Sequence, residues 1–545
     1  MKHSTRIFLI LTFLLLNFHG YSQGKKPKLV VGIVVDQMRN DYLYRFENHF
    51  GEGGFKRLLG KGYHFKNAHY NYIPTYTGPG HASVYTGTTP RYHGIIANNW
   101  YSRELDKSIY CAEDSTRQAV GGSGKNGAMS PANMISTTIS DQLRLTSNFR
   151  SKVIGVAIKD RGSILPAGHS ANAAYWYDPT AGDFITSTYY MNELPAWVKS
   201  FNDRDLPQEY LKSSWETLKD ISTYVESHDD DNDFERPIGK KDRPTFPYNF
   251  SEITKEDDYG ILRTTPFGNQ LTIEMAMAAV EGESLGEDDI TDLLAVSFSS
   301  TDYVGHAFGP HSKELQDTYV RLDRQLENFL KFLDEKVGEG AYTVFLTADH
   351  GVVHVPSYLQ SVKVKAGYYS TGRAGVYVNT EIQKALGKGE WLADVSNDQI
   401  FLNGALIDSS DYEPEHVRKI IADIALGSED VFEVYTDDQV IQGSENDDLL
   451  RLLRNGYNVQ RSGDILVVMK PNHLGNGYGN MGTTHGTGFN YDTHVPIIFY
   501  GHSIPSGKSV RKVSITDIAP TLSMLLNVSL PNAATGKPLG ELFGE

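Results

Sequence analysis

The stretch LVVGIVVD, residues 29–36, is an unbroken apolar run, rich in valine, that ends in an aspartate. Two later runs have the same form: Leu293 to Phe298 precedes Asp302, and Tyr342 to Thr347 precedes Asp349. Continuous apolarity without alternation is typical of parallel strands that are buried on both faces. Because ligands bind outside the carboxyl ends of such strands, we expect the three aspartates to meet at one edge of the sheet.

A long amphipathic segment connects the last two of these runs. Residues 312–337 carry leucine and phenylalanine at helical spacing, which makes the order strand, helix, strand. That order indicates a right-handed crossover unit. The sequence therefore predicts an α/β fold with a doubly wound, mainly parallel central sheet and helices on both faces. Two stretches, near residues 174–267 and 374–473, break this pattern, and we expect them to be inserted α+β segments over the active-site edge.

The first 22 residues have the form of a signal peptide. Lys2 and Arg6 precede the apolar run Ile7 to Leu16, and the small residues Gly20 and Ser22 follow it. We therefore expect residues 23–545 to be exported as one domain. No later stretch approaches the roughly 20 apolar residues that a membrane span needs. We expect a monomer that does not associate with membranes after cleavage.

Charge and cysteine content restrict the chemistry further. The formal net charge of −16 argues against a nucleic-acid partner, because phosphate backbones would be repelled on average. The single cysteine, Cys111, can form no intramolecular disulfide, so a metal site must use histidine and carboxylate ligands.

Ligands of that kind gather around the predicted strand ends. Asp302 and His306 form a D-x-x-x-H pair, the sequence TADHG places His350 directly after an aspartate, and His485 and His494 follow late in the chain. These residues suffice for two zinc ions. His494 is the weakest candidate, because it begins an apolar run and a hydrogen bond within the core explains it better.

Several blocks together carry a family resemblance. PTYTGPGHASVYTGTTPRYHGIIANNW, residues 74–100, resembles the nucleophile segment of the alkaline phosphatase superfamily, above all its nucleotide pyrophosphatase/phosphodiesterase branch. VVDQMR, STDYVGHAFGP, TADHG, THG and TDIAPTLSMLL resemble the other blocks of that superfamily in the same order. As a whole, the chain resembles the phosphate-irrepressible alkaline phosphatases of exported bacterial type. The resemblance implies that residues 23–545 are one catalytic domain, periplasmic or secreted in a bacterium.

The resemblance implies a role for each motif residue. Thr77 would be the nucleophile that forms a phosphothreonine, and Asn98 would donate a hydrogen bond to a phosphoryl oxygen. The local sequence alone favours Thr77 as a helix N-cap, and only the motif blocks taken together favour the nucleophile. The cofactors would be two zinc ions, and their implied ligands are Asp36, Asp349 and His350, with Thr77 facing that ion, for the first, and Asp302, His306 and His485 for the second.

The substrate class depends on a departure from the phosphodiesterase branch. That branch usually carries a Trp-Pro-Gly type turn after the strand Val153 to Ile158, whereas this chain has Lys159 and Arg161 there. Two cations suit the dianionic group of a phosphate monoester and would crowd a diester. We therefore expect an alkaline phosphatase that hydrolyses small phosphate monoesters.

Other interpretations remain open. Lys159 and Arg161 could be a solvated pair, and a phosphodiesterase or nucleotide pyrophosphatase would use the same metals. A sulfatase would need a cysteine or serine in place of Thr77. A non-catalytic metal-binding surface protein is a further alternative, against which the intact nucleophile and six ligands argue.

Overall fold

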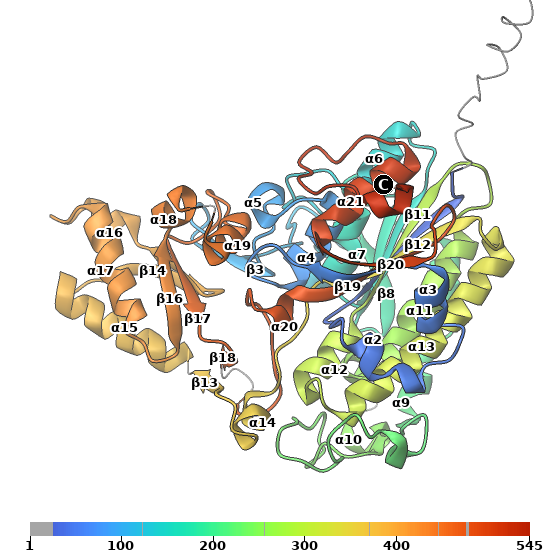
Figure 1. Cartoon of the computed structure of the whole chain (residues 1–545), viewed down its shortest axis with the longest axis horizontal. Helices are drawn as coiled ribbons and strands as arrows, with labels where there is room; N and C mark the ends of the chain where they lie inside the picture. The colour runs from blue at the N-terminus through green and yellow to red at the C-terminus, as the bar shows by residue number, and fades with distance from the viewer. Residues whose placement is uncertain are drawn as a thin grey trace, which may run out of the picture.

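The computed structural model describes residues 26–544 apart from 123, 256, 370, 445 and 476–478. Residues 1–22, the expected signal peptide, lie outside the described part of the chain. A ten-stranded sheet runs through the core (Figure 1). Its strands, from one edge to the other, are β20 (Gly507–Ser514), β2 (Tyr63–His69), β19 (His494–Gly501), β12 (Tyr342–Thr347), β1 (Leu29–Val35), β11 (Asp292–Phe298), β6 (Val153–Ala157), β7 (Ala173–Asp178), β8 (Asp183–Ser187) and β5 (Ala119–Val120).

The three apolar runs of the sequence are neighbours in the middle of this sheet. β1 pairs in parallel with β11 on one side and with β12 on the other, and all residues of these strands are buried. β6 and β7 continue the parallel arrangement beyond β11. The predicted α/β sheet with buried parallel strands is therefore confirmed for the five central strands.

The edges of the sheet are mixed. β19 runs antiparallel to both of its neighbours, β12 and β2, and β8 runs antiparallel to β7 and β5. At the outer edge, β20 is again parallel to β2. The parallel arrangement that the sequence predicts thus covers the part of the sheet that carries Asp36, Asp302 and Asp349 at its strand ends, and not the edges.

Helices cover both faces of the sheet (Figure 1). α4 (Thr77–Thr86), α6 (Ile139–Thr146), α7 (Asp160–Ala167) and α21 (Ile518–Leu526) pack on one another over one face. α3 (Phe55–Lys61), α11 (Pro266–Gly282) and α13 (Lys313–Leu333) lie on the other. α13 begins at the cap Ser312, whose side chain accepts the Leu315 amide hydrogen, so its start agrees with the predicted helix. Its last turn continues as a π-helical turn, Asp334–Gly338.

The boundary expected near residue 174 falls inside the sheet. Residues 173–187 form β7 and β8, so the departure from the core begins only after Ser187. The following segment contains α8 (Ala196–Asn202), α9 (Leu206–Leu211) and the short pair β9 (Ser214–Trp215) and β10 (Tyr248–Asn249). Trp215 Nε1 and Tyr224 OH donate to the Asp317 carboxylate at 2.8 and 2.6 Å, which fastens this segment to α13.

The second segment forms a separate lobe with its own apolar cluster (Figure 1, orange). Its four-stranded sheet has the order β14 (Leu392–Ser396), β15 (Gln399–Leu402), β17 (Ile465–Met469) and β16 (Val431–Thr436), with antiparallel pairing throughout. The helices of this lobe are α15 (Thr371–Leu386), α16 (Gly404–Asp408), α17 (Pro414–Leu426), α18 (Asp437–Gln442) and α19 (Asp448–Gly456). Within the described residues, no helix combines the length and the apolarity that crossing a membrane requires.

Candidate metal centre and nucleophile

Thr77 is the first residue of α4 and does not cap it. The N-cap position is held by Tyr76, and no side chain caps the helix there. The Thr77 side chain is 1% exposed, and its Oγ1 lies 3.5 Å from His350 Nε2 and 3.4 Å from Lys159 Nζ. The capping interpretation of Thr77 is therefore wrong, and its hydroxyl is directed at the strand-end cluster.

The first ligand group forms where β1 and β12 end side by side. Asp36 follows β1, and Asp349 and His350 follow β12; their candidate ligand atoms all lie within 4.8 Å of one another. His350 Nε2 is 3.5 Å from Asp36 Oδ1 and 3.4 Å from Asp349 Oδ2. All three residues have no exposed surface, so the parallel pairing of β1 with β12 places a carboxylate and imidazole cluster under Thr77.

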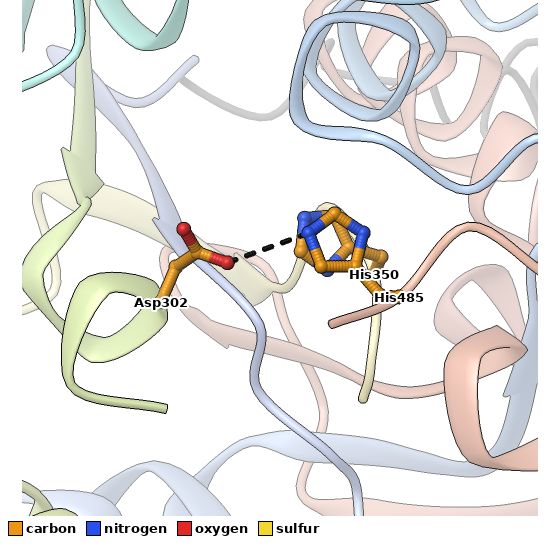
Figure 2. Close-up of side chains that lie close together, drawn as sticks. All are labelled: Asp302, His350 and His485. Atoms are coloured by element: carbon orange, nitrogen blue, oxygen red, sulfur yellow. Dashed lines mark ion pairs between the residues drawn. The ribbon is translucent and has the colours of Figure 1, made fainter. Parts of the chain in front are cut away.

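The second group lies on α12 (Ser300–Phe308) and on the loop that leads to α20 (Asn490–Thr493). Asp302 and His306 are one helical turn apart, with His306 Nε2 3.1 Å from Asp302 Oδ1. His485 Nε2 lies 3.5 Å from the same oxygen. Figure 2 shows Asp302 pointing at the His485 ring, which stacks on His350 at 3.4 Å between ring centroids. The two groups are therefore contiguous through these histidines.

Main-chain carbonyls set the tautomer of all three histidines. Nδ1 lies 2.9 Å from the Gly351 carbonyl in His350, 2.8 Å from that of Thr483 in His306 and 2.7 Å from that of Thr75 in His485. A carbonyl oxygen can only accept, so each Nδ1 carries the hydrogen. Each ring, when neutral, then presents the Nε2 lone pair to the cluster, as a metal ligand must. In His306, burial acts to lower the pKa but the adjacent Asp302 carboxylate outweighs it, so the pKa of this ring is raised.

The donor set of the first group fits a cation. Asp36 Oδ1 and Asp349 Oδ2 are buried and accept no hydrogen bond from any described residue. Both face His350 Nε2, whose lone pair cannot donate to them. Three atoms with lone pairs thus converge, and burial raises the pKa of Asp349 well above its usual value. The arrangement is unfavourable unless a proton or a metal ion lies between these atoms. Burial also lowers the pKa of His350 and of His485, which keeps both rings neutral and able to bind a metal.

Lys159 is buried between the two ligand groups. Its Nζ is 2.7 Å from Asp36 Oδ2 and 2.6 Å from Asp302 Oδ2, so it bridges the two ligand groups and is 5% exposed. Burial raises the pKa of Asp36 to about 6, although Lys159 acts in the opposite direction. The interpretation of Lys159 as a solvated strand-end residue is therefore wrong.

Arg161 and Asn98 come from two other parts of the chain, and Asn98 contacts the residue that follows Thr77. Arg161, in the first turn of α7, donates from Nη1 to the Tyr110 hydroxyl at 3.0 Å. Asn98 Oδ1 accepts the Gly78 amide hydrogen at 2.8 Å. Since its oxygen is occupied in this way, the Asn98 amide nitrogen remains to donate to a ligand.

Two residues outside the sequence prediction hold the ligands in place. Gln37 donates from its main-chain amide to Asp349 Oδ1 at 3.0 Å and from Nε2 to Asp302 Oδ1 at 2.6 Å. Asp492 accepts from the amides of Gly486 and Thr487 and so fixes the loop after His485. Gln37 directly follows Asp36 and has a positive φ of 66°, which a sequence pattern does not reveal.

His494 lies in a different place. Its Nε2 is 2.8 Å from the Lys66 carbonyl on β2, and its ring stacks on His69. The expected hydrogen bond of His494 is therefore present, at a half-buried position at the start of β19.

The second glycine of the TGPG turn, Gly80, packs closely against the main chain of Asp349. A Cβ at this position would lie 2.3 Å from the Asp349 carbonyl oxygen, which is main chain and cannot move aside easily. We expect Gly80→Ala to push α4 away from β12, to lower the free energy of unfolding by about 1–3 kcal/mol and to reduce bound metal. Thermal unfolding and elemental analysis measure both effects.

Gly60→Ala in α3 is the matched control, because no atom of the described residues lies within 4 Å of its added Cβ. That variant should gain up to about 1 kcal/mol, since alanine is the better helix former. Equal melting temperature and equal metal content in Gly80→Ala and the wild type would contradict the requirement for close packing.

Comparison with known proteins identifies the family. Residues 30–488 match the family model described as type I phosphodiesterase / nucleotide pyrophosphatase. The alkaline phosphatase PafA of Elizabethkingia meningoseptica is 46% identical over 95% of this chain and 95% of its own. A protein of Myroides odoratus named calcium-transporting ATPase is 44% identical over the same shares.

The fold agrees with a crystal structure of a PafA variant in which one threonine is changed to serine and one asparagine, one lysine and one arginine to alanine. That structure is 45% identical to this chain and superposes with a TM-score of 0.91, covering 95% of this chain and 99% of the other. The chain is therefore a member of the type I phosphodiesterase / nucleotide pyrophosphatase family, within the alkaline phosphatase superfamily.

Proposed function

We propose that this protein is an alkaline phosphatase that hydrolyses phosphate monoesters through a phosphothreonine on Thr77, with two zinc ions as cofactors. One observation carries the proposal: three imidazoles, each fixed by a main-chain carbonyl, present Nε2 to buried carboxylates beside the Thr77 hydroxyl. The 46% identity to an alkaline phosphatase over nearly the full length supports the same conclusion.

In this mechanism the chain supplies the nucleophile and its orientation. Thr77 attacks phosphorus in line, the leaving group departs with the ester oxygen, and water later hydrolyses the phosphothreonine. Asp36, Asp349 and His350 would hold one zinc ion, and Asp302, His306 and His485 the other. When bound, the two ions would supply the Lewis acidity that favours ionisation of the threonine hydroxyl and stabilises charge on the leaving oxygen.

Asn98, Lys159 and Arg161 would bind the phosphoryl oxygens. The Asn98 amide nitrogen donates to no described residue, Lys159 lies 3.4 Å from the nucleophile, and Arg161 lies two residues beyond Lys159 at the start of α7. Threonine, asparagine, lysine and arginine are also the four residue types substituted in the PafA variant, in the same order along the chain. This agreement supports the assignment of Thr77 and its three partners.

We also propose that the protein acts outside the cytoplasm, because of the signal-like residues 1–22, and that it is a monomer. Residues 23–545 would form one catalytic domain, and the lobe near 374–473 would be an insertion in it. Its substrates would be small phosphate monoesters.

The choice of monoesters over diesters should depend on Lys159 and Arg161. Charge-assisted hydrogen bonds contribute about 1.5–3 kcal/mol each, so replacing both residues with alanine should lower monoester kcat/KM by about two to four orders of magnitude. Diester hydrolysis should fall much less, because a diester offers fewer free oxygens and less charge. Rates on an aryl phosphate and on its methyl diester measure this selectivity.

Arg150→Ala/Lys152→Ala is the matched control. It removes two cations with the same spacing at the opposite end of β6, where Lys152 contacts the Glu283 carbonyl, and should change neither rate. Equal losses on both substrates in the Lys159/Arg161 variant, with less bound metal, would contradict a role in selectivity. Faster turnover of the diester by the wild type would favour a phosphodiesterase.

A further inference from the structure

One hairpin joins the Asn98 side of the site to the Arg161 side. β3 (Asn99–Ser102) and β4 (Lys107–Tyr110) pair antiparallel, with Asn99 opposite Tyr110. The Cys111 amide then donates to the Asn98 carbonyl at 2.8 Å. A Cβ at Gly78 would lie 3.2 Å from both Cys111 Sγ and Asn98 Oδ1, so the end of β4 lies against the turn that carries Thr77.

The Tyr110 hydroxyl stands between a carboxylate and a guanidinium. It donates its hydrogen to Asp160 Oδ1 in a short hydrogen bond and accepts one from Arg161 Nη1 at 3.0 Å. Asp160 Oδ1 also accepts the Arg161 main-chain amide hydrogen. A phenol has one hydrogen to donate, so these two contacts fix its orientation.

The interposed phenol leaves the charge of Arg161 available. Among the described residues, no Asp160 oxygen lies within ion-pair distance of the Arg161 guanidinium, and Arg161 Nε is buried and makes no hydrogen bond. A direct carboxylate pair would instead occupy the guanidinium edge that binds phosphate in bidentate fashion. Burial raises the pKa of Tyr110 well above its usual value, so its hydroxyl keeps the hydrogen in alkaline solution.

We propose that Tyr110 is a positioning residue. Asp160 fixes its hydroxyl, and the hydroxyl in turn orients the Arg161 guanidinium so that it can bind the phosphoryl group of a monoester without a carboxylate partner. The inference rests on the proposed function and deepens it. The Tyr110 hydroxyl does not touch the substrate, and its effect passes through Arg161 alone.

A double-mutant cycle tests this dependence. Tyr110→Phe removes only the hydroxyl and should lower monoester kcat/KM about tenfold, weaken inhibition by inorganic phosphate by a similar factor and leave diester hydrolysis nearly unchanged. In an Arg161→Ala background, the same substitution should change monoester kcat/KM by less than about twofold, because the group that it positions is gone.

Tyr101→Phe is the matched control. Tyr101 lies on the same hairpin and donates to Asp106 Oδ1 at 2.6 Å, so its substitution also removes a phenol bound to an aspartate, on the outer part of the hairpin. It should leave both activities unchanged. Melting temperature and metal content should equal those of the wild type in both phenylalanine variants.

Multiplicative losses in the double variant would overturn the proposal, because Tyr110 would then act independently of Arg161. Equal losses on monoester and diester would overturn it as well. If the wild type, loaded with zinc, hydrolysed no monoester, the proposed function would fail instead. Calorimetric binding of inorganic phosphate to the four proteins of the cycle would still decide whether Tyr110 acts through Arg161.

Discussion

Thr77→Ala should lose at least about a thousandfold in kcat on an activated aryl phosphate, because the covalent route disappears. Thr77→Ser should retain much of the activity, since its hydroxyl takes the same place at the start of α4. The covalent intermediate offers a second readout: acid-quenched wild-type protein should carry phosphate on the peptide that contains Thr77, and the alanine variant should carry none.

Thr86→Ala is the control for loss of a buried threonine from the same helix. Thr86 Oγ1 donates to the Ala82 carbonyl at 2.8 Å, which is a local helical bond far from the ligand groups. This variant should keep its turnover. Near-native turnover by Thr77→Ala with unchanged metal content would show that another group attacks phosphorus.

Removal of metal should abolish turnover and lower thermal stability, and added zinc should restore both. Three buried carboxylates, Asp36, Asp302 and Asp349, converge near one lysine, so the cluster has an excess of negative charge that bound cations would offset. A metal that binds only the folded state at a thousandfold above its Kd adds about 4 kcal/mol per site. Elemental analysis should find two zinc ions per chain, and calorimetry before and after chelation measures the stabilisation.

A pair of histidine variants separates the ligand role from general damage. His485→Ala should reduce zinc from two ions towards one, whereas His494→Ala should leave both, because His494 is bonded to the Lys66 carbonyl on β2. Full activity with one ion or none would contradict the two-zinc proposal. Equal zinc loss in the two variants would contradict the assignment of His485.

The sequence predicted the centre of the sheet more accurately than its edges. The expected strands at residues 29–35 and 342–347 coincide with β1 and β12, because burial on both faces leaves a continuous apolar run. Whether an edge strand runs parallel or antiparallel to its neighbour leaves no comparable pattern in the amino-acid sequence. β19 follows β12 in the sheet but lies about 150 residues later in the chain, so its antiparallel pairing depends on the path of the intervening lobe.

The candidate site was predictable as far as side-chain chemistry goes. Asp36, Asp302, Asp349 and their histidines were expected at the strand ends, and the structure places them together. Gln37 was missed because its contribution depends on a left-handed backbone and a main-chain amide. Tyr110 was missed because its partner, Asp160, is 50 residues away and nothing in their spacing relates them.

The carbonyl groups that orient His306, His350 and His485 belong to the main chain, and this affects how the protein can vary. Every amino acid has a main-chain carbonyl, so a substitution at Thr75, Gly351 or Thr483 changes the side chain and keeps the oxygen that accepts from the histidine. Insertions and deletions, which redirect the backbone, are the changes that remove it. Among natural descendants of this chain, the lengths of these three loops should therefore be held more strictly than the identities of the residues in them.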